Sequence, residues 1–306
     1  MNNKLLSGHI DLLVSAILWG GSIVVLKNLI WDIPPMTINF FRFFIAALTL
    51  FFIAWHKKVS IKIEKKEITP LVIKALTGVS LYYFLETLSL KYLEASIVGI
   101  ILGIIPIFTL AVDIVLNGRR VKPFLVLSFG LSILGIGLTV ADSLETRYLN
   151  GSLLGYLLIF GSNCSWVFYT YISKKYNSDC PNLIAIAYQM LFASWAFIPG
   201  LFTEIPKISL DLNWYMVSLQ IILLALPSSA FAYYFYFRGL KKIDMSIASL
   251  YLNLIPVISL ISSCLFLGEK LTIFKTSGAL LVALSLASMV FAGNDILGGK
   301  NGRGSV

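Results

Sequence analysis

The segment LKYLEASIVGIILGIIPIFTL (Leu90–Leu110) returns 150 positions later as LKKIDMSIASLYLNLIPVISL (Leu240–Leu260). The register continues without a gap to Val140 and Val290. It passes through a polar loop, an apolar run with a proline and a glycine turn, which makes a chance match of low-complexity sequence a poor explanation. The chain is therefore an internal duplication.

The duplication extends towards the start of each half. Trp19 and Trp166 lie in the first apolar run of their halves, and a polar residue follows each tryptophan 23 positions later, at Arg42 and Gln189. We predict a first repeat over residues 1–149, a second over 150–292 and a disordered cytoplasmic tail over 293–306, because the tail is polar and glycine-rich.

Composition places the chain among membrane proteins. Of its 306 residues, 58% are hydrophobic and 13% charged, and the mean hydropathy is +0.87. The net charge of +9 does not predict a nucleic-acid partner, because the basic residues sit mainly in short loops between apolar runs. The three cysteines lack metal-ligand spacing, so neither a metal site nor a disulfide framework is expected. No cofactor is predicted.

Apolar runs long enough to span a bilayer occur ten times. The first is retained as a span, since it carries Asp11 and lacks a small-residue cleavage site. The sequence thus predicts an all-α polytopic membrane protein with ten transmembrane helices, at Ile10–Val25, Met36–Trp55, Ile68–Leu88, Ala95–Leu116, Phe124–Ala141, Gly151–Ser173, Asn182–Phe202, Trp214–Phe237, Met245–Leu267 and Ile273–Ala292.

Basic residues in the loops orient these spans. Sixteen lysines and arginines fall on the side that holds both termini and six on the other, which predicts cytoplasmic termini in a plasma-membrane protein. Five helices per half is an odd number, so the second half enters the bilayer upside down. Such inverted-topology repeats are typical of secondary transporters, whose pathway lies between the halves. We expect a monomer embedded in lipid.

Several short motifs resemble the drug/metabolite transporter superfamily. They are Leu18-Trp19-Gly20-Gly21, Phe41-Arg42-Phe43, the segment from Lys91-Tyr92 to Pro106, and Gly268-Glu269. The resemblance implies a solute carrier with a central cavity lined mainly by the first, third, fourth, sixth, eighth and ninth helices. Two departures are Arg119, where the second half has an acidic residue, and Asn163-Cys164-Ser165-Trp166, which lacks the glycine pair.

Glu86 is the most informative ionisable residue inside a span, because a charge in the bilayer is costly unless it faces protein or water. Tyr82 and Tyr83 precede it by four and three residues and share its helical face. A carboxylate beside aromatic rings suits an ammonium or amino group. The alternative is a structural carboxylate that meets water outside the membrane or pairs with Arg42 or Lys91.

The other polar positions favour structural interpretations to different degrees. Arg42 is predicted to have a structural or gating role, either by snorkelling or by clamping helix ends, and Gln189 is its counterpart. Asp11 and Lys74 are interpreted as snorkelling side chains near the cytoplasmic face. Pro106 and Pro256 are expected to bend the fourth and ninth helices beside the pathway. The remaining candidates for substrate binding are Trp19, Trp166, Tyr233, Tyr251 and Asn253.

The leading functional prediction is a secondary-active or facilitative transporter that moves a small organic metabolite, an amino acid or an amine, by alternating access. Import of a quaternary ammonium or another organic cation is the alternative, and protons are a candidate coupling ion. A channel or lipid scramblase would favour a ring of charges or a polar groove, and neither is visible. No catalytic motif or phosphate-binding loop suggests an enzyme or ATPase.

Overall fold

The computed structural model describes residues 3–105, 107–108, 127, 130–131, 133–138, 141, 149–175, 180–240, 242, 251–252 and 254–297. Every regular element in these ranges is helical. The elements of the first half are α1 (Asn3–Leu29), α2 (Pro35–His56), α3 (Lys65–Ala75), η1 (Leu76–Leu81), α4 (Tyr82–Ser89) and α5 (Ala95–Leu102). Those of the second half are α8 (Leu149–Lys175), α9 (Asn182–Glu204), η2 (Ile205–Lys207), α10 (Trp214–Leu223), η3 (Leu224–Phe231), α11 (Ala232–Leu240), α13 (Leu254–Leu267) and α14 (Ile273–Leu297).

Within the described ranges, six helical segments are long and apolar enough to cross a membrane: Leu5–Leu29, Pro35–His56, Lys65–Ser89, Leu153–Ser173, Asn182–Lys207 and Trp214–Gly239. They confirm the first, second, third, sixth, seventh and eighth predicted spans. The predicted fourth, fifth and ninth spans extend beyond the described residues, so the count of ten stays a prediction.

Both ends of the chain differ from the sequence prediction. Helix α1 begins at Asn3 instead of Ile10, because polar residues are tolerated where a helix projects beyond the apolar layer. Helix α14 continues to Leu297, so residues 293–297 are helical and not part of a disordered tail. Adding residues to an existing helix costs little compared with starting one. The rest of the predicted tail lies outside the described residues.

Helices of the two halves interlock. Helix α2 packs along α9, and α13 packs against both α1 and α5. The close approach of α5 and α13 requires a glycine: a Cβ at Gly99 would overlap Ser259, whose Oγ donates to the Ala95 carbonyl over 2.9 Å. The buried core is consequently shared between the two halves.

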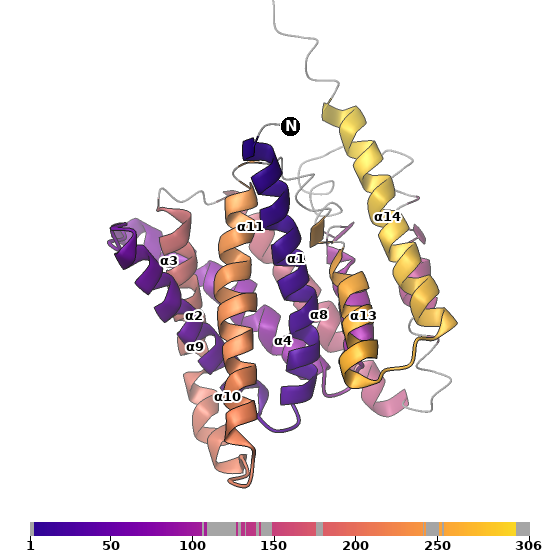
Figure 1. Cartoon of the computed structure of the whole chain (residues 1–306), viewed down its shortest axis with the longest axis horizontal. Helices are drawn as coiled ribbons and strands as arrows, with labels where there is room; N and C mark the ends of the chain where they lie inside the picture. The colour runs from indigo at the N-terminus through magenta and orange to yellow at the C-terminus, as the bar shows by residue number, and fades with distance from the viewer. Residues whose placement is uncertain are drawn as a thin grey trace, which may run out of the picture.

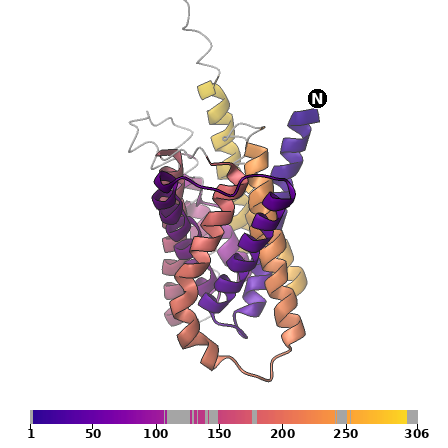
Figure 2. The ribbon, with the colours of Figure 1, turned by 90° about the vertical axis from the view of Figure 1, so that its left-hand side faces the viewer.

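The N-terminal start of α1 and the Leu297 end of α14 lie at the same end of the bundle (Figure 1). We call this end the N face and the opposite end, where α1 finishes at Leu29, the far face. The connection from α9 to α10 also lies at the far face (Figure 2). A chain whose two ends lie at the same face crosses the membrane an even number of times.

The third span of each half contains a π-helical segment, η1 in the first half and η3 in the second. Their first residues, Leu76 and Leu224, lie at nearly equivalent repeat positions. A π segment leaves backbone groups without regular helical partners. One carbonyl in each accepts a bond from the other half: Ser165 Oγ donates to Thr77 O over 2.7 Å and Trp19 Nε1 to Ser228 O over 3.0 Å.

Candidate functional site

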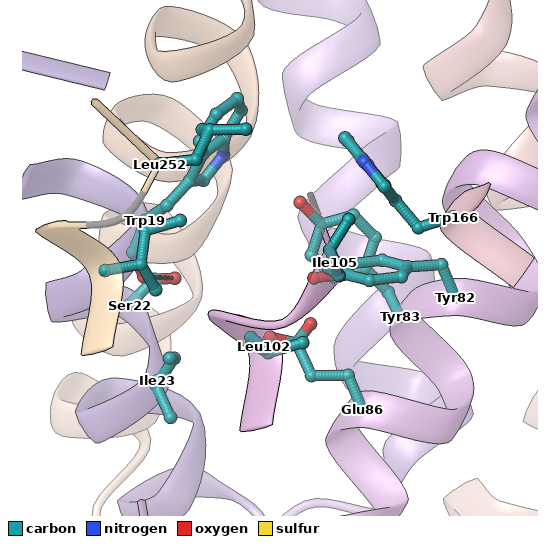
Figure 3. A pocket seen from close by; sticks show the side chains of 11 residues that line it. Trp19, Ser22, Ile23, Tyr82, Tyr83, Glu86, Leu102, Ile105, Trp166 and Leu252 are labelled. Atoms are coloured by element: carbon teal, nitrogen blue, oxygen red, sulfur yellow. Dashed lines mark hydrogen bonds between the residues drawn. The ribbon is translucent and has the colours of Figure 1, made fainter. Parts of the chain in front are cut away.

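A cavity of about 40 Å³ lies between the two halves (Figure 3). Helix α1 contributes Trp19, Ser22 and Ile23, and α4 contributes Tyr82, Tyr83 and Glu86. The rest of the lining comes from Leu102, Ile105, Trp166, Leu252 and Ile255. The first, third, fourth, sixth and ninth predicted spans therefore reach the cavity, whereas the eighth contributes no lining residue to it.

Glu86 is the acidic residue of the lining, and its side chain is drawn beside Leu102 in Figure 3. The residue is only 3% exposed, and its Oε2 has no hydrogen-bond partner among the described residues. Among the described residues, Glu86 forms no ion pair with Arg42, Lys91 or any other cation. The carboxylate is thus buried in the cavity wall without a countercharge in contact.

Aromatic rings line the same cavity as this carboxylate. The rings of Tyr82 and Tyr83 meet edge to face with centroids 4.6 Å apart, and the Tyr82 and Trp166 centroids are 5.0 Å apart. Tyr233 lies outside the lining but supports it, because its ring packs 5.2 Å from that of Trp19. The wall is therefore built from aromatic side chains of both halves.

A hydrogen bond joins equivalent positions of the two repeats. The Tyr233 hydroxyl donates to the Tyr83 hydroxyl over 3.1 Å, and the two tyrosines are 150 residues apart, which is the repeat shift. Both are buried. The bond therefore lies where the two halves meet, directly behind the aromatic wall.

Arg42 does not snorkel, in contrast to one of the two roles considered for it. The residue is 0% exposed, and its Nε donates to Ser229 Oγ over 2.6 Å and its Nη2 to Ser228 Oγ over 3.1 Å. Its guanidinium carbon lies 4.4 Å from the centre of the Tyr83 ring. Helix α2 places it deep in the bundle, where η3 supplies the acceptors, so it clamps a π segment.

Its counterpart Gln189 makes a simpler contact. The side chain is 7% exposed, and Oε1 accepts a bond from the Tyr169 hydroxyl over 3.2 Å. The two repeats therefore use the same buried position differently, with a cation in the first half and a neutral amide in the second.

The remaining predicted residues are placed as follows. Tyr251 is outside the cavity lining, and its hydroxyl lies 2.7 Å from His9 Nδ1. Pro256 packs against Gly103, the residue that follows α5, where a Cβ would overlap the proline ring. Helix α5 ends at Leu102, four residues before Pro106. Pro106 itself and Asn253 lie outside the described residues, and the predicted bends stay predictions.

Several lining residues were missed because they are apolar. Leu102 and Leu252 occupy equivalent repeat positions, and so do Ile105 and Ile255. These identical pairs belong to the repeat that reveals the duplication. Retention of the same residue in both halves was therefore a signal that could have located the cavity, although hydropathy assigned them to the core.

Asp11 has an explanation other than snorkelling. It is 2% exposed, pairs with Arg238, and accepts a bond from Lys242 Nζ over 2.8 Å. These contacts join α1 to the end of α11 near the N face.

Among the described residues, no group of three His, Cys, Asp or Glu side chains is placed to hold a metal ion.

The sequence pattern of the EamA-like transporter family matches residues 6–141 and 153–291. An uncharacterized transporter of Archaeoglobus fulgidus is 27% identical over 92% of this chain and 98% of its own length. A Salmonella typhimurium protein named a probable amino-acid metabolite efflux pump is 23% identical, over 93% of this chain and 94% of its own. A crystal structure that is 16% identical superposes with a TM-score of 0.68, covering 94% of this chain and 98% of the other.

Proposed function

Since the chain belongs to the EamA-like transporter family, we propose that it carries a small organic metabolite with a positively charged amino group, an amino acid or an amine. The transporter is a multi-pass membrane protein. The proposed site is the cavity between the halves, and alternating exposure of that cavity to the two faces moves the solute. No cofactor is needed, and the proposed carrier works as a monomer.

The observation that carries this proposal is the unpaired carboxylate of Glu86 in an aromatic wall. An ionised side chain away from water is costly without a partner. A substrate ammonium would supply both the countercharge and N–H donors for Oε2. The rings of Tyr82, Trp166 and Trp19 would add cation–π attraction of about 0.5 to 2 kcal/mol each. The Salmonella relative named an amino-acid metabolite efflux pump agrees with this substrate class.

A quaternary ammonium is the competing substrate, favoured by the same aromatic rings. It lacks N–H groups, so it could not donate to Glu86 Oε2. Comparing a primary amine with its N-trimethylated form therefore separates the two. Tighter binding of the primary amine supports the proposal, whereas tighter binding of the trimethylated form would replace it.

Glu86→Gln tests the role of the carboxylate. Purified variants would be titrated with amino acids and amines while their thermal unfolding is recorded, because a ligand that binds the folded state raises the melting temperature. We expect Glu86→Gln to stay folded and lose the stabilisation. Glu64→Gln is the control, since Glu64 is exposed and its ion-pair partner among the described residues is the exposed Lys66. Unchanged stabilisation by every active ligand would refute the site.

The carboxylate also offers a route for proton coupling. A proton and a substrate cation would compete for Glu86, so transport into proteoliposomes should depend on pH in the natural protein. Glu86→Gln should lose substrate affinity and pH dependence together. Loss of affinity with an unchanged pH profile would place proton coupling elsewhere.

Orientation is proposed from the loop charges: the N face, with most of the basic residues, is cytoplasmic. Single cysteines at 57–67 and 206–213 should be labelled from opposite sides of the plasma membrane. Labelling of both from the same side would overturn this topology.

A further inference from the structure

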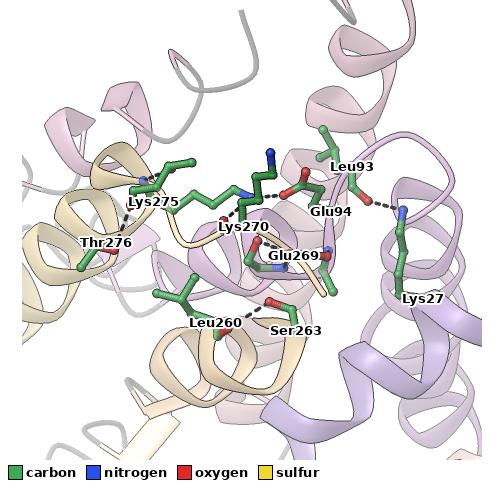
Figure 4. A network of polar contacts seen from close by, with 12 residues as sticks. Lys27, Leu93, Glu94, Leu260, Ser263, Glu269, Lys270, Lys275 and Thr276 are labelled. Atoms are coloured by element: carbon green, nitrogen blue, oxygen red, sulfur yellow. Dashed lines mark hydrogen bonds and ion pairs between the residues drawn. The ribbon is translucent and has the colours of Figure 1, made fainter. Parts of the chain in front are cut away.

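The turn at residues 90–94, between α4 and α5, is held at the far face by charged side chains (Figure 4). Glu269 Oε1 accepts from the Ala95 amide over 2.8 Å, and Oε2 accepts from the Ser96 amide over 3.2 Å and from the Ser96 hydroxyl. A carboxylate at a helix N-terminus satisfies free amides and complements the helix dipole. Glu269 belongs to the turn between α13 and α14, so this cap links the two halves.

Cations complete the arrangement. Lys27 Nζ donates to the Leu90 and Leu93 carbonyls over 2.6 and 2.8 Å, at the C-terminal end of α4. Lys275, only 2% exposed, pairs with Glu94. The turn therefore has a cation at the end of one helix and a carboxylate at the start of the next, as the helix dipoles favour.

A second carboxylate cap links the halves at the same face. Glu204, the last residue of α9, accepts from the Thr37 amide over 2.8 Å and the Thr37 hydroxyl over 3.0 Å, and from the Met36 amide over 3.3 Å. These groups belong to the first turn of α2. Two helix starts of the first half are thus capped by acids of the second half.

The repeat predicts where mirror-image caps at the N face would originate, and both positions are basic. Arg119 stands 150 positions before Glu269, and Lys57 stands 147 before Glu204, the shift that relates Trp19 to Trp166. A cation cannot accept from helix amides and is repelled by a helix N-terminus. Lys57 donates instead to the Tyr234 hydroxyl over 2.7 Å, and Arg119 is outside the described residues.

From these caps we infer that Glu269 is a latch that keeps the far face closed, and that Lys57, at the repeat position equivalent to Glu204, cannot form the matching cap at the N face. Opening of the far face therefore requires the Glu269 cap to break. The inference deepens the proposed function and rests on its alternating-access cycle.

The test measures the accessibility of the cavity from each side. Ser22→Cys, a lining position, is introduced after Cys164, Cys180 and Cys264 are replaced by serine. Membrane-impermeant maleimide is applied to either face of oriented vesicles. Glu269→Gln should raise far-face labelling on the order of tenfold, because one charge-assisted hydrogen bond contributes about that factor. Glu64→Gln should leave it unchanged.

Spin labels at Tyr92 and Leu271 give a second readout, the distribution of distances between these two turns. In Glu269→Gln a second, longer distance should be populated. Ser96→Ala, which removes only the hydroxyl contact, should produce a smaller change of the same sign if Glu269→Gln does not fold.

The outcomes separate the two proposals. If labelling from both sides is the same in Glu269→Gln and Ser96→Ala as in the unsubstituted chain, the latch is overturned and the carrier proposal is unaffected. The cysteine at position 22 could instead be labelled from one side only in every variant, with and without an active amine. That result would overturn the alternating-access function itself.

Discussion

Ser228 and Ser229 offer a matched pair for measuring what the buried arginine contributes. The two serines are adjacent and at most 1% exposed, and both accept from Arg42. The bond from Nε to Ser229 is 2.6 Å long, whereas the bond from Nη2 to Ser228 is 3.1 Å. The Ser228 hydroxyl also donates to the Leu224 carbonyl of its own helix over 2.7 Å. The shorter bond should contribute more stability.

Ser229→Ala would leave Arg42 Nε buried without an acceptor, and Nη1 already has none among the described residues. Losing one hydrogen bond from a charged donor costs about 1.5 to 3 kcal/mol of unfolding free energy. We expect that loss for Ser229→Ala and about 0.5 to 1.5 kcal/mol for Ser228→Ala, whose contact is longer. In an Arg42→Leu background, Ser229→Ala should be nearly neutral, because both partners are then absent.

Unfolding of the purified protein in mixed micelles, followed by tryptophan fluorescence, would give these free energies. Ser263→Ala is the control, since Ser263 is 0% exposed and its hydroxyl donates only to the nearby Leu260 carbonyl. If Ser229→Ala costs no more than Ser263→Ala, or costs the same with and without Arg42, the clamp on η3 is not a source of stability.

Two further predictions concern packing and charge. Asp11→Asn should lower the unfolding free energy by about 1 to 3 kcal/mol, because the buried carboxylate loses its charge-assisted hydrogen bonds from Arg238 and Lys242; thermal melts should show a much smaller effect for Glu64→Gln, and equal effects would contradict this. Gly99→Ala should cost about 1 to 3 kcal/mol, because the new methyl overlaps Ser259. Ser259→Gly should restore part of that loss in the same melts, and no restoration would refute the steric explanation.

Sequence periodicity was sufficient for several features of the site. Residues three and four apart share a helical face, and this placed Tyr82 and Tyr83 beside Glu86 in the cavity wall. The two tryptophans in the first apolar run of each half, Trp19 and Trp166, also line the cavity. These predictions needed only local geometry, which a helix imposes whatever its neighbours are.

Contacts between distant helices could not be predicted in the same way. The partners of Arg42 in η3, the Tyr233–Tyr83 bond and the pairing of Asp11 with Arg238 join residues more than 140 positions apart. Tyr251 was expected in the pathway, yet its hydroxyl lies beside His9. The π segments were equally invisible, because hydropathy does not distinguish an α turn from a π turn.

Hydropathy and the repeat at 150 positions are properties of the order of residues alone, and they were enough to identify a duplicated membrane protein. Which polar groups find partners depends on how the helices pack. A carboxylate is either capped, as Glu269 is by two amides of α5, or left free, as Glu86 Oε2 is in the cavity. That difference depends on which helix end or ring the packing brings within hydrogen-bond distance, and the repeat pattern carries no such distances.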